Sequence, residues 1–194
     1  MEELFKYFYE SFLDESKTVK NDSYITLKHV ATGKYLSSCI DNHNVIYAGP
    51  TVPDIRCVWI VKEEGREKFR NNQLGKFLTI FYGDLFLLTN VTNISLSHNL
   101  NVSDSDDEES PATNNLKVFG KFYSSTLWHF KSTNSENPPY VKSKDIINLQ
   151  SDQFVLRSSE STFTNHSKTY QEVACHKDRI GGNDEWCIEI IEKS

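Results

Sequence analysis

Several large classes of protein are excluded by what the sequence lacks. No apolar stretch approaches the roughly 20 residues that a membrane-spanning helix requires. The N-terminus is acidic and has neither the basic region nor the continuous apolar run of a signal peptide. Lysine and arginine number 21 against 27 acidic residues, for a net charge of −6, so a broad nucleic-acid-binding surface is not expected. We therefore expect a cytoplasmic or nuclear protein, with neither nucleic acid nor membrane among its partners.

Motifs for catalysis and metal binding are absent too. None of the six histidines lies in an HExxH pattern, and the sequence has no Gly-x-Ser-x-Gly or P-loop segment. Four cysteines occur without CxxC pairing or zinc-finger spacing: Cys39, Cys57, Cys175 and Cys187. We expect a protein that is not an enzyme and holds no metal or cofactor. Its cysteines are predicted to be buried thiols, with a disulfide as the alternative in an oxidising compartment.

Residues 1–20 hold the one good helix candidate, ahead of a domain that spans residues 21–194. Four aromatic side chains recur at i, i+3, i+4 and i+7 and so share one helix face: Phe5, Phe8, Tyr9 and Phe12. This amphipathic helix either packs on the surface of its own domain or docks on a partner or a second copy of the chain.

From Tyr24 onward, short apolar runs alternate with Gly, Asn, Asp and Ser, which is typical of strands and turns. Aromatic residues make up 12% of the chain, and they favour β structure. Residues 101–115, NVSDSDDEESPATNN, form an acidic insert without an apolar anchor and are predicted to be a mobile loop. Ser103 and Ser105 directly precede its acidic run, as an acidic-directed kinase requires, but a solubilising loop is the simpler interpretation.

An internal repeat is the most informative feature of the sequence. Three segments each close with a tryptophan and apolar residues after it: Trp59, Trp128 and Trp186. Residues 27–36 and 69–78 open two of the segments with the same spacing, and Gly-Lys-aromatic-Leu recurs in both. Gly33 and Gly75 would supply the turn. Residues 147–156 open the third segment without a glycine.

The repeat predicts an all-β domain closed around an axis. Each tryptophan is too large for one pair of strands to bury, whereas three copies arranged as a barrel would bury them together and remove sheet edges. We expect a β-trefoil of three pseudo-repeats and about 12 strands, preceded by the short N-terminal α-helix. A β-sandwich or another barrel is the alternative.

Two stretches resemble the MIR domain family. Residues 25–36, ITLKHVATGKYL, are similar to the opening of a MIR repeat, and residues 170–189 are similar to its close through Gln-Glu-Val-x-Cys and Asn-Asp-x-Trp-x-Ile-Glu. The family comprises protein O-mannosyltransferases, stromal-cell-derived-factor-like proteins, and inositol trisphosphate and ryanodine receptors. The resemblance covers the first and third repeats, and it implies a β-trefoil without catalysis of its own that binds a ligand, glycan or partner.

Candidate ligand contacts lie in these two stretches. Sugars are held by planar hydrogen-bonding side chains and a stacking aromatic ring. Side chains of this kind border the first turn and the start of the closing motif: His29, Thr32, Lys34 and Tyr35, then Gln171, Glu172 and His176. Core packing of Tyr35 and a turn-stabilising role for His29 are the simpler interpretation.

A polar cluster surrounds the Gly181-Gly182 pair. It contains Asp178, Asn183, Asp184 and Glu185. A turn whose side chains bind backbone amides is the simpler interpretation. A polar ligand pocket beside Trp186 or a weak cation site built from oxygen ligands is the alternative.

We expect a module that mediates protein–protein interaction in the cytosol or nucleus, which the aromatic helix face favours. A module that binds a glycan, which the MIR resemblance favours, is the alternative. The Gln-x-Trp motif of ricin-type lectins is not present, since Cys57, Thr126 and Asp184 stand two residues before the tryptophans.

Deleting residues 1–18 tests the docking role of the helix. If its aromatic face binds a partner or a second copy, the deletion lowers the oligomeric mass measured by light scattering, or abolishes recovery of the partner by affinity capture. An unchanged mass together with unchanged recovery would show that the helix does not dock.

Overall fold

The computed structural model describes residues 17–39, 44–64, 79–92, 98–103, 108–122 and 126–191. The aromatic face of the predicted helix lies outside these residues, and so does Gly75. Thr18 and Lys20 are not helical, because they form isolated β-bridges to Lys142 and Thr79. Val19 between them is fully buried, so the body of the domain begins before residue 21. A deletion that removes only the predicted helix should therefore end at residue 16.

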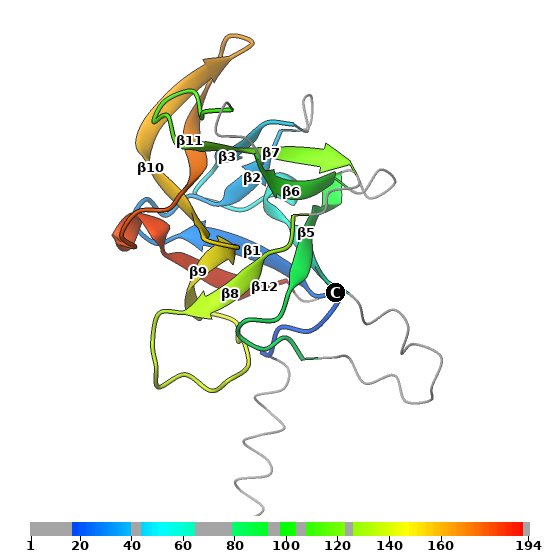
Figure 1. The fold of residues 1–194 in the computed structure, drawn as a ribbon. Coiled ribbons are helices and arrows are strands. Elements are labelled where there is room, and N and C mark those ends of the chain that lie inside the picture. Colours follow the sequence, from blue (N-terminus) through cyan, green and yellow to red (C-terminus); the bar gives the residue numbers. More distant parts are fainter. Residues whose placement is uncertain are drawn as a thin grey trace, which may run out of the picture.

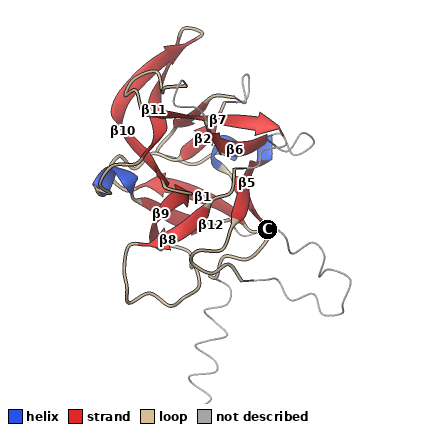
Figure 2. Ribbon diagram, viewed as in Figure 1, coloured by secondary structure: helices blue, strands red, loops and turns tan. Residues whose placement is uncertain are grey.

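The described residues form twelve strands that belong to one hydrogen-bonded sheet, which confirms the all-β prediction (Figures 1 and 2). The strands are β1 (Tyr24–His29), β2 (Leu36–Ser38), β3 (Ile46–Ala48), β4 (Trp59–Glu63), β5 (Phe86–Asn90), β6 (His98–Val102), β7 (Leu116–Phe122), β8 (His129–Ser132), β9 (Ile146–Ser151), β10 (Phe154–Asn165), β11 (Lys168–His176) and β12 (Trp186–Ile190). Two single-turn 3-10 helices, η1 (Ile55–Cys57) and η4 (Gly182–Asp184), precede β4 and β12.

Six of the strands close into an antiparallel barrel. β1 pairs with β4 and β12, β4 pairs with β5, and β9 pairs with β8 and β12. A bridge between Phe86 and Trp128 joins β5 to the start of β8 and completes the ring. The closed ring leaves no free edge on the barrel.

The other six strands form three hairpins that cap one end of the barrel. β2 pairs with β3, β6 with β7, and β10 with β11. β11 also pairs with β3 and β7, and a bridge from Val45 to Phe119 links the first two hairpins. A barrel closed by a triplet of hairpins is a β-trefoil-like arrangement, in which β10 and β11 extend furthest from the body (Figure 1).

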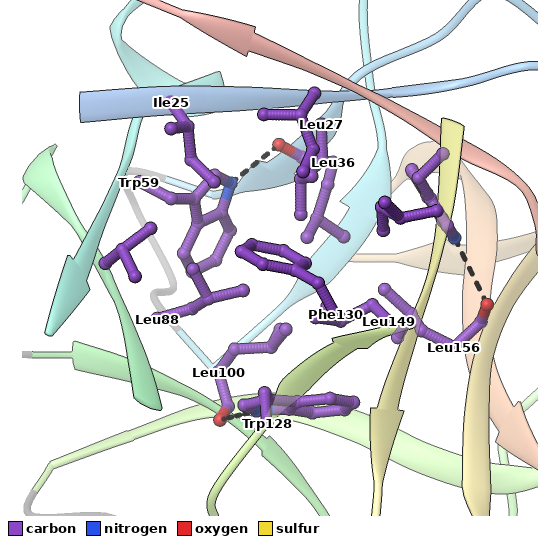
Figure 3. Packing of buried hydrophobic residues seen from close by; sticks show 14 of the residues in the cluster. Ile25, Leu27, Leu36, Trp59, Leu88, Leu100, Trp128, Phe130, Leu149 and Leu156 are labelled. Atoms are coloured by element: carbon purple, nitrogen blue, oxygen red, sulfur yellow. Dashed lines mark hydrogen bonds between the residues drawn. The ribbon is translucent and has the colours of Figure 1, made fainter. Parts of the chain in front are cut away.

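Each repeat is tied together by the indole of its tryptophan. Trp59, Trp128 and Trp186 are fully buried. Their Nε1–H groups donate to the carbonyl oxygens of Leu36 (2.9 Å), Leu100 (2.9 Å) and Leu156 (3.1 Å). Figure 3 shows these three bonds within the apolar core. Because a buried indole N–H requires an acceptor, the bonds join the barrel to the first strand of each hairpin.

The opening of the second repeat was predicted in the wrong place. Leu100 of β6 accepts the bond from Trp128, so Leu100 rather than Leu78 corresponds to Leu36. β5 is the strand that pairs with β4 and opens this repeat. Residues 69–78 match the first opening only in residue types and spacing. The structural repeat is defined by the leucine whose carbonyl accepts the hydrogen bond from the tryptophan indole. Residues 65–78 lie outside the described part of the chain.

The acidic insert also differs from the expected loop. Residues 101 and 102 belong to β6, and the side chain of Ser103 is buried. Further on, the carboxylate of Glu172 accepts hydrogen bonds from the Ala112 N–H (2.7 Å) and the Thr113 hydroxyl. These bonds attach the end of the insert to β11. Residues 104–107, which include Ser105, lie outside the described residues.

All four cysteines are free thiols. Cys39, Cys57 and Cys175 are buried and Cys187 is half-buried. Burial raises the pKa of Cys57, Cys175 and Cys187, which keeps these thiols protonated and unreactive near neutral pH. Among the described residues, no helix has the length and apolar character needed to cross a bilayer.

Replacing Trp128 with Phe should lower the free energy of unfolding by about 2 kcal/mol, because it removes ring volume and leaves the Leu100 carbonyl without its indole donor. Urea denaturation followed by circular dichroism measures the change. Leu85→Ser is the control, since Leu85 is 48% exposed and its substitution should cost less than about 0.5 kcal/mol. Equal stability of Trp128→Phe and the parent protein would contradict a structural role for this bond.

Candidate functional site

The first turn and the η4 turn meet at His29. This side chain is fully buried, and its ring centroid lies 5.0 Å from that of Trp186. Its Nε2–H donates to the Asn183 carbonyl (3.0 Å), and its Nδ1 accepts from the Thr32 hydroxyl (2.9 Å). Gly33 completes the turn with a φ of 69°, which glycine adopts without strain. His29 is therefore a neutral link between two turns.

Gln171 extends this chain of hydrogen bonds to the third hairpin. Its Nε2 group donates to Thr32 Oγ1 (3.3 Å) and to Ser158 Oγ (2.9 Å), and the Ser158 hydroxyl donates to the Glu172 carbonyl (2.8 Å). Both hydrogens of the amide are thus used within the protein, which fixes the orientation of Gln171 and leaves its Oε1 as an acceptor.

Tyr35 belongs to a separate cluster on β12. It is 4% exposed, and its hydroxyl donates to Glu189 (2.8 Å), which also accepts from Lys144 Nζ (2.7 Å). Burial, with the hydrogen bond to Glu189, raises the pKa of Tyr35 to about 12. Burial alone would raise the pKa of Glu189, but hydrogen bonds from Lys144 and Tyr35 lower it. The ring of Tyr35 is packed in the domain, as the simpler interpretation expected.

His176 is equally enclosed. Its Nδ1 accepts from the Asp178 N–H (3.1 Å), so its Nε2–H donates to the carboxylate of Asp184 (2.8 Å). Asp184 is fully buried and also accepts from the Gly181 N–H (2.6 Å). This is the turn with bound backbone amides that was expected here. Among the described residues, no group of three or more histidine, cysteine or acidic side chains could hold a metal ion.

The candidate contacts are therefore divided by the structure. His29, Tyr35, Glu172 and His176 are buried and satisfied by protein partners, and their role as ligand contacts stays a prediction. Gln171 is also buried but lines an open groove together with Lys34. Thr32 is half-buried and is hydrogen-bonded to His29 and Gln171.

The open groove lies between the first and third hairpins and has a volume of about 430 Å³. We call it the tyrosine groove and define it by its lining residues: Lys34, Tyr47, Ala48, Gly49, Pro50, Arg56, Lys168, Thr169, Tyr170 and Gln171. The pairing of β3 with β11, at Tyr47 with Glu172 and Ala48 with Gln171, brings its two walls together. Its size falls in the range of small-molecule sites.

An aromatic cluster forms one wall of the tyrosine groove. The rings of Tyr47 and Tyr170 meet edge to face with centroids 4.7 Å apart. Phe163, which pairs with Tyr170 across the third hairpin, stacks on it at 5.6 Å. The tip of this hairpin turns at His166 and Ser167, both with positive φ, as in a two-residue turn of the primed type. The short tip carries Lys168 to the rim of the groove.

Tyr47, Arg56, Lys168 and Tyr170 were not among the sequence-based candidates. Tyr47 and Tyr170 are far apart in the sequence, and no motif links them. Arg56 sits in η1, where the Asp54 carboxylate accepts from its backbone N–H (2.9 Å) and its Nε (3.0 Å). One signal in the sequence was usable. Phe163 and Tyr170 lie equally far before and after the same turn, and a hairpin places two such residues opposite each other on one face.

Neither a protein-family model nor a curated protein sequence matches the chain. Solved structures do. The SDF2-like protein of Arabidopsis thaliana has a TM-score of 0.69 and 18% identity, over 88% of this chain and 94% of that one. The Pmt1-Pmt2 protein O-mannosyltransferase complex of S. cerevisiae, bound to the sugar donor, has a TM-score of 0.69 and 20% identity, over 89% of this chain but only 25% of its own.

A third solved structure is a ricin B-like lectin of Macrolepiota procera in complex with lactose. It has a TM-score of 0.58 and 10% identity, over 88% of this chain and 97% of the lectin. At these identities the likeness shows the fold. Since the first two structures come from groups that the MIR resemblance named, the chain has the β-trefoil-like fold of MIR-type proteins.

The buried His29 should make stability depend on pH. Burial lowers its pKa from 6.5, against weaker opposing effects of Asn183 and Asp184. As the pH falls below 6.5 the unfolded chain binds a proton that folded His29 does not, so the free energy of unfolding decreases until the pH passes the folded pKa. Burial shifts the pKa of His129 the same way.

Urea denaturation between about pH 7.5 and pH 5 measures this dependence. His29→Gln retains a donor near the Asn183 carbonyl but cannot titrate, so its stability should fall less steeply than that of the parent protein. His129→Gln, measured in parallel, separates the contribution of the second histidine. A His29→Gln slope equal to that of the parent would contradict the assignment to His29.

Proposed function

We propose that this protein is a non-enzymatic binding module that holds a carbohydrate in the tyrosine groove. One observation carries the proposal: two tyrosine rings, an amide fixed by its own hydrogen bonds and several cations line a single open groove between two hairpins. An aromatic ring beside oriented hydrogen-bonding groups is the equipment that sugar recognition requires. The free thiols support a reducing compartment, the cytosol or nucleus.

Two of the similar structures support a sugar as the ligand. The Macrolepiota procera lectin is in complex with lactose, and the Pmt1-Pmt2 complex is bound to a sugar donor. In this chain the proposed contacts are the half-buried ring of Tyr170, the hydroxyl of Tyr47 and the Oε1 of Gln171. Tyr47 is 7% exposed and lines the groove, so its hydroxyl is the part of this side chain proposed to reach the ligand.

A protein partner is the second candidate. It is favoured by Val52, in the loop before η1, and by Ile55, the first residue of η1, which are 75% and 57% exposed. Two exposed aliphatic side chains near each other in the sequence suit the centre of a small protein contact. This surface lies beside the tyrosine groove in the sequence but does not line it.

A glycan array, followed by calorimetry on the best ligand, tests the carbohydrate proposal. Tyr47→Phe removes one hydroxyl and should weaken binding about three- to tenfold, and Tyr170→Ala should weaken it about tenfold by removing the stacking face. The matched control is Val52→Ser with Ile55→Ser, which should leave sugar binding unchanged but weaken a protein partner. Circular dichroism confirms that each variant is folded. An array without specific binding would overturn the carbohydrate proposal and leave the protein partner.

A further inference from the structure

The charged side chains that line the tyrosine groove are all cations. Lys34, Arg56 and Lys168 contribute to its lining, and no aspartate or glutamate does. The chain as a whole has a net charge of −6, so the charge of the groove lining is opposite in sign to the net charge of the chain. These cations come from separate parts of the chain, which the fold brings together around one hollow.

Arg56 is held in a fixed orientation. The carboxylate of Asp54 accepts from its Nε (3.0 Å to each oxygen) and pairs with its Nη2. The bonds to Asp54 use Nε and Nη2, which leaves Nη1 as a further donor of a residue that lines the groove. Arg56 and Tyr47 both line the groove, and the charge of Arg56 acts to lower the pKa of Tyr47 against the larger raising effect of burial.

Lys34 stabilises the first turn through its backbone. Its carbonyl accepts from the His29 N–H (2.8 Å) and closes the first turn. Its ammonium group forms no ion pair with any described residue. A side chain that has no structural partner and lines a groove with two other cations can serve an anion.

We propose that the ligand of the tyrosine groove is an acidic saccharide, one that carries a carboxylate or sulfate group. The anionic group would lie among Lys34, Arg56 and Lys168, while the sugar ring contacts Tyr47 and Tyr170. This inference rests on the proposed function and narrows its ligand class. An ammonium and a guanidinium together bind such groups by charge-assisted hydrogen bonds, and the adjacent tyrosines and Gln171 favour a saccharide over a free inorganic anion.

Calorimetry with matched oligosaccharides tests the inference. A sulfated chondroitin tetrasaccharide and its desulfated, carboxyl-reduced counterpart are titrated into the intact chain at low and at moderate salt. The acidic sugar should bind at least about tenfold more tightly at low salt, and the difference should shrink as salt screens the groove. Inorganic sulfate, titrated alone, should bind more weakly than either tetrasaccharide.

Lys34→Gln removes one cation and keeps the backbone carbonyl that closes the first turn. It should weaken binding of the acidic sugar about three- to tenfold, and more than it weakens binding of the neutral sugar. The matched control is Lys121→Gln, which removes an exposed charge from β7 away from the groove and should change neither affinity. A thermal melt confirms that both variants are folded.

The outcomes separate the two proposals. If both tetrasaccharides bind equally and without salt dependence, the groove recognises sugars but not their charge, and the acidic-saccharide inference is wrong while the proposed function stands. Tighter binding of sulfate than of the acidic sugar would also overturn the inference. If no saccharide of any charge binds, on the array or in calorimetry, the proposed function is wrong and the inference falls with it.

Discussion

The hydrogen bond from each tryptophan indole to a leucine carbonyl is the interaction on which the rest of the structure depends. It joins a barrel strand to the first strand of the hairpin above it, once in each repeat. The three indoles also pack within the apolar core (Figure 3). Because the donor is buried, its loss would cost both the bond and the packing around it. Barrel and cap are therefore one cooperative unit.

A second set of bonds depends on this frame and positions the site. His29, Thr32, Gln171 and Ser158 form a continuous polar chain from the first turn to the third hairpin. That chain holds the first and third hairpins in register, and it is at this junction that Tyr47 meets Tyr170. The residues that the MIR resemblance selected thus support the wall of the tyrosine groove, while the groove itself is lined mostly by their neighbours.

How far the sequence could predict the structure follows from the range of the interactions. Some features can be recognised locally in the sequence: the spacing of the tryptophans, the Gly33 turn and a composition that favours strands. These features predicted the fold class and the first and third repeats. Leu100 could not be found, because residues 69–78 imitate a repeat opening and only the indole contact distinguishes the two. The pairing of Tyr47 with Tyr170 depends on strands from different repeats, and nothing local encodes it.

The three hairpins that cap the barrel are unequal in length: β2 and β3 have three residues each, whereas β10 and β11 have twelve and nine. The tyrosine groove uses the unlike walls of the first and third hairpins, so the rotation that relates the repeats does not reproduce it elsewhere in the described structure. The threefold repeat of the fold therefore carries a groove that does not share its symmetry. The proposed site therefore occurs once in the described part of the chain, and any gain in avidity at this site must come from bringing several chains together on the same ligand.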